Sequence, residues 1–167
     1  MGTSRADYNK PHRVGTLSGL FGMPYHYEMA SDSERVGRFR EAIRRVCGGK
    51  TLLEIGYGTG VLSVAALPDA KRVYAIEIDP NVSLVGDRNF DSSRFADRIV
   101  RFSGEDVFDL IKGDALPWGE IDVVLAELLS TALVVENQVP IMRALAQKLK
   151  ADCVRIPHAV VSLVEGV

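Results

Sequence analysis

The feature that most constrains the fold is a glycine loop at residues 56–60, which reads Gly-Tyr-Gly-Thr-Gly. It follows a largely apolar predicted strand at 51–55, and 17 residues beyond the last glycine a carboxylate, Glu77, closes the apolar run at 73–76. In an α/β sheet, glycines let the backbone of such a loop approach a ligand closely, and a carboxylate at the end of the next strand accepts hydrogen bonds from ribose hydroxyls. The loop and Glu77 together predict a site for an adenosyl group.

The spacing of the glycines narrows the choice of ligand. A dinucleotide-binding loop has Gly-x-Gly-x-x-Gly and a phosphate-binding P-loop ends in Lys-Ser/Thr, and neither pattern is present. Gly-x-Gly-x-Gly preceded by an acidic residue on the strand is instead typical of S-adenosylmethionine sites. The sequence therefore predicts S-adenosyl-L-methionine as the cofactor and S-adenosyl-L-homocysteine as the product. The predicted binding residues are Glu54, Gly56, Gly58, Gly60 and Glu77.

Composition excludes several other classes of protein. A chain of 167 residues predicts one domain, and a formal net charge of −2 lacks the basic excess of nucleic-acid-binding domains. No apolar run approaches the ~18 residues of a membrane span. Cys47 and Cys153 match no metal-ligand spacing and predict reduced thiols. We expect a cytoplasmic protein without membrane or metal, and nucleic acid is disfavoured as a partner.

Strands and helices are predicted to alternate along the chain. This alternation predicts an α/β fold with a doubly wound, mostly parallel, Rossmann-like sheet that has helices on both faces. Residues 1–24 are predicted as an irregular arm and 25–167 as the cofactor-binding domain. Predicted strands lie at 51–56, 72–78, 99–103 and 121–126, with a strand-like run at 154–164. One predicted helix begins at a capping box formed by Ser31 and Glu34, and another begins at Pro80. Three more are predicted at about 60–67, 104–111 and 138–149.

In such sheets a ligand binds beyond the carboxyl ends of the strands. Besides the residues above, Glu105, Asp106 and Glu127 are expected at this edge. Either Glu105 or Asp106 is a candidate contact for the adenine. The alternative is that both are acidic residues favoured in the first turn of a helix, and the sequence does not decide between them.

A second pair of carboxylates follows the fourth predicted strand. Glu127 ends that strand, and Glu136 comes after an uncharged stretch at 128–135. Two carboxylates at the ends of one loop can bracket a planar cation, and guanidinium fits because each carboxylate accepts a fork of N–H donors. Such contacts draw positive charge toward some nitrogens and leave another free to attack a sulfonium methyl. The alternative for Glu136 is a favourable helix start.

Three segments carry a resemblance to a known family. Residues 126–130, Ala-Glu-Leu-Leu-Ser, resemble the Ser-Glu-Leu-Leu-Gly segment of symmetric-dimethylating protein arginine methyltransferases. Residues 28–35 resemble the Glu-Met-Leu-x-Asp-x-x-Arg segment of that family. Residues 150–157 are similar to its Lys-x-Asp-Gly-x-x-Ile-Pro, with Cys153 where glycine is usual. The resemblance covers about residues 25–165.

The resemblance implies roles for individual residues. Arg35 would bind the carboxylate of the cofactor, and Met29 would line the methyl-transfer site. Glu127 and Glu136 would form the double-glutamate loop and act as the catalytic residues. His26, a lone histidine near this segment, is interpreted as structural.

The sequence departs from the family in what completes the substrate site. The β-barrel that carries a Thr-His-Trp loop and a dimerisation arm is not found in these 167 residues. A partner chain could complete the site, the methyl acceptor could differ, or the sequence could be a fragment of a longer protein. The predicted acceptor is a protein or a small molecule. Two rival functions remain open, an RNA methyltransferase and a non-catalytic cofactor-binding subunit, although Ala-Glu-Leu-Leu replaces the Asn/Asp-Pro-Pro-Tyr/Phe motif of exocyclic-amine enzymes.

Overall fold

The computed structural model describes residues 22–129, 137–161 and 163. Its centre is a five-stranded sheet in the order β3-β2-β1-β4-β5, and all four pairs of neighbouring strands are parallel. This confirms the predicted doubly wound α/β fold. The strands are β1 (Thr51–Ile55), β2 (Arg72–Glu77), β3 (Ile99–Ser103), β4 (Val123–Ala126) and β5 (Val154–Ile156).

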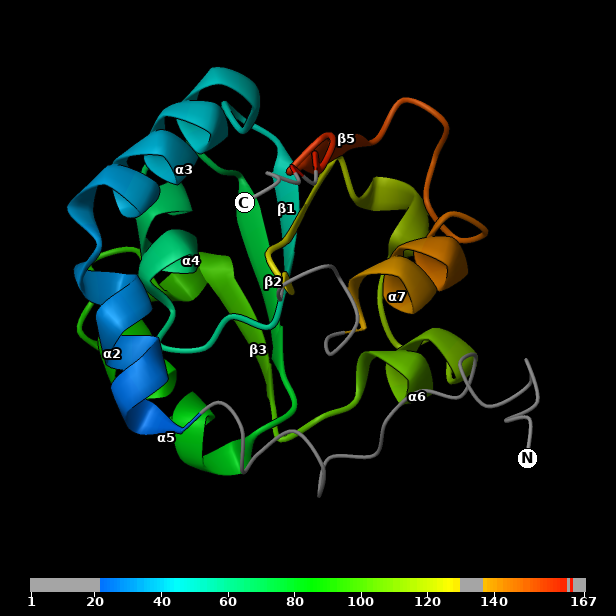
Figure 1. The fold of residues 1–167 in the computed structure, drawn as a ribbon. Helices are drawn as coiled ribbons and strands as arrows, with labels where there is room; N and C mark the ends of the chain where they lie inside the picture. The colour runs from blue at the N-terminus through cyan, green and yellow to red at the C-terminus, as the bar shows by residue number, and fades with distance from the viewer. Residues whose placement is uncertain (1–21, 130–136, 162, 164–167) are drawn as a thin grey trace.

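Helices cover both faces of the sheet. In Figure 1, α3 and α4 lie on one side of the strands and α6 and α7 on the other. The described α-helices are α2 (Met23–Ser31), α3 (Ser33–Val46), α4 (Val61–Ala66), α5 (Pro80–Asp91), α6 (Val107–Lys112) and α7 (Gln138–Leu145). None of these helices is long and apolar enough to cross a membrane.

The core has one layer on each face of the sheet. Ile43 of α3 and Leu62 of α4 pack with Leu52 of β1 on one face, whereas Leu53 packs with Leu145 of α7 on the other. Every residue of β1 and of β4 is buried. This explains why the predicted strands lack the alternation of apolar and polar residues found in half-exposed sheets.

The start of α3 differs from the prediction. Ser31 does not cap this helix, because it is the last residue of α2. The N-cap is Asp32, whose extended backbone separates the two helices and whose Oδ1 accepts a hydrogen bond from Arg35 N at 2.9 Å. Aspartate is as good a cap as serine, so the pattern indicated the helix but the wrong cap residue. Helix α2 begins at Met23, inside the segment 1–24 that the sequence predicts as irregular.

The last strand is also shorter than predicted. β5 ends at Ile156, and the described residues from Pro157 to Val161 form no strand. Proline has no backbone N–H to donate to a neighbouring strand, so it stops the ladder although valines follow it.

Candidate functional site

A pocket lies beyond the carboxyl ends of β1, β2 and β4, as predicted for this fold. Helix α2 and the glycine loop form part of its wall, and the beginnings of α6 and α7 contribute the rest. Residues that represent each part are Met29, Gly58, Glu77, Asp106, Glu127 and Ile141. The structure therefore brings the predicted cofactor residues other than Gly60, together with the first predicted catalytic residue, to one pocket. Gly60 packs instead against Phe90.

The glycine loop is packed tightly on both sides. A Cβ on Gly60 would lie 2.5 Å from a ring carbon of Phe90, and a Cβ on Gly56 would lie 2.5 Å from Leu128 Cδ2. Both glycines also have positive φ angles, 75° and 72°, which side chains of L-residues disfavour. Larger residues would displace the loop, so the glycines are required for its shape and for the close approach of a ligand.

The carboxylate of Glu77 is fixed against this loop. It accepts hydrogen bonds from the backbone N–H groups of Gly58 and Asp79, each at 2.9 Å. Glu77 is only 7% exposed, and burial raises the pKa of its carboxyl above the ordinary value. A carboxylate held in this way at the end of β2 has the position expected of the residue that binds the ribose hydroxyls.

Glu54 lies deeper, at the bottom of the pocket. It is 3% exposed, and its Oε2 accepts a hydrogen bond from Ser63 Oγ on α4. Burial raises the pKa of Glu54 to about 8. A carboxyl of this kind is ready to ionise when a cation comes close, and a sulfonium or an ammonium group would supply that charge.

The structure distinguishes the two candidates for the adenine contact. The Asp106 side chain is the N-cap of α6, since its Oδ1 accepts a hydrogen bond from Phe108 N at 2.8 Å. Glu105 is exposed and places its backbone N–H 3.1 Å from the carbonyl oxygen of Glu77. Both residues line the pocket. The helix-start interpretation is thus right for Asp106, while the carboxylate of Glu105 is not used as a cap.

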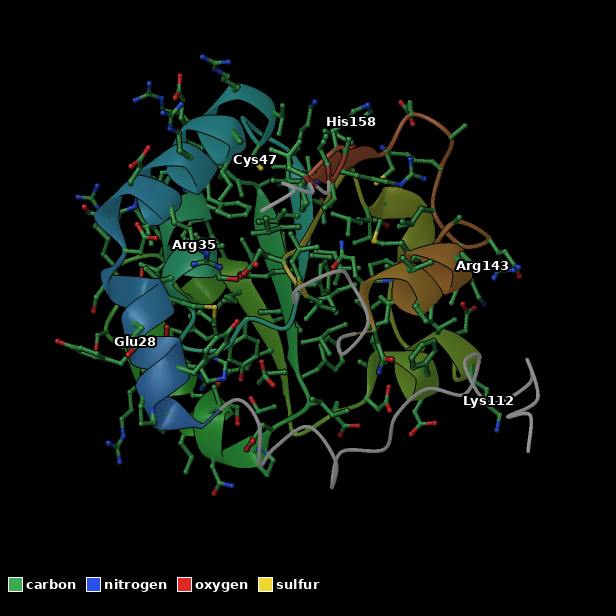
Figure 2. The ribbon with its side chains drawn as sticks, in the orientation of Figure 1. Glu28, Arg35, Cys47, Lys112, Arg143 and His158 are labelled. Atoms are coloured by element: carbon green, nitrogen blue, oxygen red, sulfur yellow. The ribbon has the colours of Figure 1, made fainter. Side chains whose placement is uncertain are left out.

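Arg35 contacts two parts of the pocket wall, one on α2 and one at the end of β4. Its guanidinium donates to the Glu127 carboxylate at the end of β4 and to the carbonyl oxygen of Met29, the latter at 3.2 Å. In Figure 2, Arg35 extends from α3 toward the interior, whereas Glu28 of α2 points outward. Burial raises the pKa of the Glu127 carboxyl, and the positive charge of Arg35 partly opposes this effect. Glu136, the second predicted catalytic residue, lies outside the described residues.

The sequence interpretation undervalued one pocket residue, His26, and missed a buried residue beside the pocket, Gln138. His26 lines the pocket, and its Nδ1 would lie 3.1 Å from a Cβ on Gly58. It is three residues before Met29 on α2, and this helical spacing places both on one face, so the signal was available. Gln138 is buried at the start of α7, and its Oε1 accepts a hydrogen bond from Leu128 N at 3.0 Å. No motif in the sequence indicated that contact.

Comparison with known proteins places the chain in a family. The family model described as ribosomal protein L11 methyltransferase (PrmA) matches residues 41–152, which is more than half of the chain. The chain belongs to the PrmA methyltransferase family. This assignment confirms a methyltransferase domain with S-adenosylmethionine as its cofactor.

Relatives of this PrmA-family chain include both uncharacterised and named proteins. An uncharacterised protein of Methanocaldococcus jannaschii is 35% identical over 147 residues, which cover 84% of this chain and 53% of the relative. Ribosomal protein arginine N-methyltransferase rmt3 of Schizosaccharomyces pombe is 30% identical over 122 residues, which cover 71% of this chain and 21% of that protein. The chain spans about half the length of the first curated relatives that it matches.

The fold of this PrmA-family chain is similar to that of solved arginine methyltransferases. The Trypanosoma brucei PRMT1 enzyme–prozyme heterotetrameric complex with AdoHcy matches with a TM-score of 0.66 and 22% identity. The match covers 81% of this chain and 41% of that chain. At 22% identity this likeness shows that the two chains share a fold, and it carries no statement about substrate.

Proposed function

We propose that this chain is the catalytic half of an S-adenosylmethionine-dependent methyltransferase that acts on a nitrogen of arginine type in a protein. The observation that carries the proposal is the contact between Glu127 and the guanidinium of Arg35. Arg35 donates to Oε2 of Glu127, and the remaining lone-pair sites of this carboxylate could accept N–H donors from a second planar cation of the same chemistry. The named function of the rmt3 relative supports the same acceptor.

The residues of the pocket divide into two groups by role. Glu77 would accept hydrogen bonds from the ribose hydroxyls, and Arg35 would bind the carboxylate of the cofactor. The glycine loop would let the backbone approach the adenosyl group closely. Bound S-adenosylmethionine supplies a methyl group on a positively charged sulfur. Glu105, which does not cap α6, is the better candidate for an adenine contact.

The acceptor side depends on Glu127 and, by the resemblance, on Glu136. The carboxylate of Glu127 would accept N–H donors of the acceptor and draw positive charge toward those nitrogens. The remaining nitrogen would then attack the methyl carbon in line with the carbon–sulfur bond that breaks. S-adenosylhomocysteine would leave, and the methylated nitrogen would lose one N–H proton to solvent. Positioning of this kind can lower a barrier by ~7–11 kcal/mol. Met29, on the α2 wall, would line the path of the methyl group.

A second candidate function is a cofactor-binding subunit without activity of its own, for which a partner chain would supply the acceptor site. The chain spans about half the length of its first relatives. A cytoplasmic location and a small-molecule acceptor also stay predictions.

The test is transfer of a labelled methyl group from S-adenosylmethionine into a cell extract, with wild type beside Glu127→Gln. Glu120→Gln is the matched control, because Glu120 is exposed and does not line the pocket. We expect protease-sensitive label with wild type and Glu120→Gln, none with Glu127→Gln, and cofactor affinity within a few-fold throughout. Ribonuclease-sensitive label would support the RNA rival. Binding of cofactor without any label would support the subunit.

A further inference from the structure

Gln138 is a polar residue in a buried position, 8% exposed, at the first position of α7. Burial of a side-chain amide is unfavourable unless its atoms find hydrogen-bond partners. The Gln138 Oε1 accepts a hydrogen bond from the backbone N–H of Leu128 at 3.0 Å. Since the backbone nitrogen can only donate, the contact also determines which way the amide faces.

Leu128 is the residue directly after Glu127, and its side chain is held as well. Its Cδ2 lies 2.5 Å from where a Cβ on Gly56 would be, so the leucine fills the space left by that glycine. On the other side of Glu127, Ala126 is paired with Ile55 in the sheet. The backbone is therefore fixed before Glu127 by β4 and after it by Gln138 and the glycine loop.

We propose that Gln138 is a positioning residue for Glu127, an inference that rests on the proposed role of Glu127 in binding the acceptor. Without the amide oxygen, the N–H of Leu128 loses its partner, and the backbone after Glu127 loses one of the two contacts that fix it there. Transfer of a methyl group requires the acceptor nitrogen to be held in line, and a displacement of about 1 Å can cost about 10²-fold in rate. Gln138 does not itself line the pocket, so its loss would reach the cofactor only through Leu128 and Glu127, and we expect it to change the rate of transfer more than the cofactor affinity.

Three variants of the full chain test this proposal. Gln138→Met keeps the length of the side chain and removes the acceptor oxygen, whereas Gln138→Glu retains an oxygen that accepts the same N–H. Val139→Met is the control, because Val139 is the next residue of α7 and is 51% exposed. The measurements are hydrogen exchange of the Leu128 amide by NMR, the cofactor Kd, and kcat with the KM for S-adenosylmethionine in methyl transfer to extract protein.

With Gln138→Met we expect faster exchange at Leu128 and a fall in kcat of about tenfold to 10²-fold, with Kd and KM for the cofactor within about twofold. Gln138→Glu should restore both exchange protection and most of kcat, and Val139→Met should match wild type. A purely structural role predicts loss of cofactor affinity together with kcat and no rescue by glutamate, which would overturn the proposal. Wild-type kcat in Gln138→Met while Glu127→Gln is inactive would also overturn it and leave the proposed function standing. Activity retained by Glu127→Gln would instead refute the proposed function, and this inference with it.

Discussion

The guanidinium of Arg35 on α3 pairs with the carboxylate of Glu127 at the end of β4. The sequence predicts that Arg35 binds the cofactor and Glu127 the acceptor, so this ion pair would connect the two proposed binding functions. Both side chains are largely shielded, with 22% and 17% of their surfaces exposed. Binding events on either side of the pocket therefore act on a shared charge.

Arg35→Gln is expected to weaken S-adenosylmethionine binding by about 10- to 10²-fold, the loss typical of a charged hydrogen bond worth about 1.5–3 kcal/mol. Isothermal titration calorimetry measures it directly. Arg38→Gln is the matched control, since the Arg38 side chain is 77% exposed on the same helix. Equal affinities for both variants would remove Arg35 from the cofactor site.

Glu77→Gln should also weaken cofactor binding, by a similar factor. The carboxylate fixes the glycine loop through Gly58 N and would lose this charge-assisted contact together with its ribose acceptors. Adenosine, which has the ribose but no sulfonium, should lose affinity to a comparable extent. If adenosine binding were unaffected while S-adenosylmethionine binding fell, Glu77 would act on the charged end of the ligand instead.

Stability is expected to depend on pH through Glu54. Burial raises its pKa in the folded protein from 4.5 to about 8, so the folded state retains a proton that the unfolded chain has released. The stabilising contribution is complete below about pH 4.5 and is lost as the pH rises through about 8. Urea unfolding at pH 6 and pH 8.5 should show wild type losing more free energy of unfolding than Glu54→Gln. Parallel losses in the two proteins would contradict the shift.

The raised pKa of Glu54 also predicts that a proton is released when the cofactor binds. A cationic ligand favours the ionised carboxyl, so up to about one proton should leave Glu54 at pH 7. Titration calorimetry in two buffers with different ionisation enthalpies counts this proton. S-adenosylhomocysteine, which lacks the sulfonium charge, should release fewer protons. Glu54→Gln should release fewer with either ligand.

Tyr57→Phe tests how much the hydroxyl contacts of this loop residue contribute to stability. The Tyr57 hydroxyl contacts Asp87 Oδ1 and Ser103 Oγ, each at 2.9 Å, and the residue is 3% exposed. Removing the hydroxyl should lower the free energy of unfolding by about 1–3 kcal/mol, because the half-buried carboxylate of Asp87 loses a hydrogen-bond donor. Tyr27→Phe, at a residue 71% exposed, should change it by less than about 0.5 kcal/mol. Similar losses in both variants would mean that the hydroxyl contacts contribute nothing.

Much of the fold was predictable because its signals are local. The buried apolar runs, the glycine loop and Pro80 at the start of α5 each follow from short-range preferences, and Asp79 caps that helix through the N–H of Asn81 at 2.8 Å. The errors came where two local solutions compete, as with Ser31 and Asp32 for the cap of α3. Periodicity cannot choose between neighbouring cap residues that satisfy the same N–H groups.

For the candidate site, the motifs predicted which residues take part but not which of them contact one another. The motifs located Glu77, Arg35 and Glu127, but no motif predicts that Arg35 pairs with Glu127. That contact joins residues 92 positions apart in the chain. Nor does any local pattern predict that Gln138 accepts from Leu128, ten residues before it, since that spacing belongs to no regular helix or turn. Such relationships depend on the order of strands in the sheet, which places the end of β4 beside the loop after β1.

Helix α2 carries His26 and Met29 toward the pocket, yet no residue of this helix is buried, and only Asp32 separates it from α3. A helix with so little buried surface adds little to the stability of the domain by itself. A ligand that contacts these side chains would contribute part of the binding free energy to docking the helix. We therefore expect a substitution on the outer face of α2 that weakens the helix to lower the affinity for the cofactor without touching the ligand.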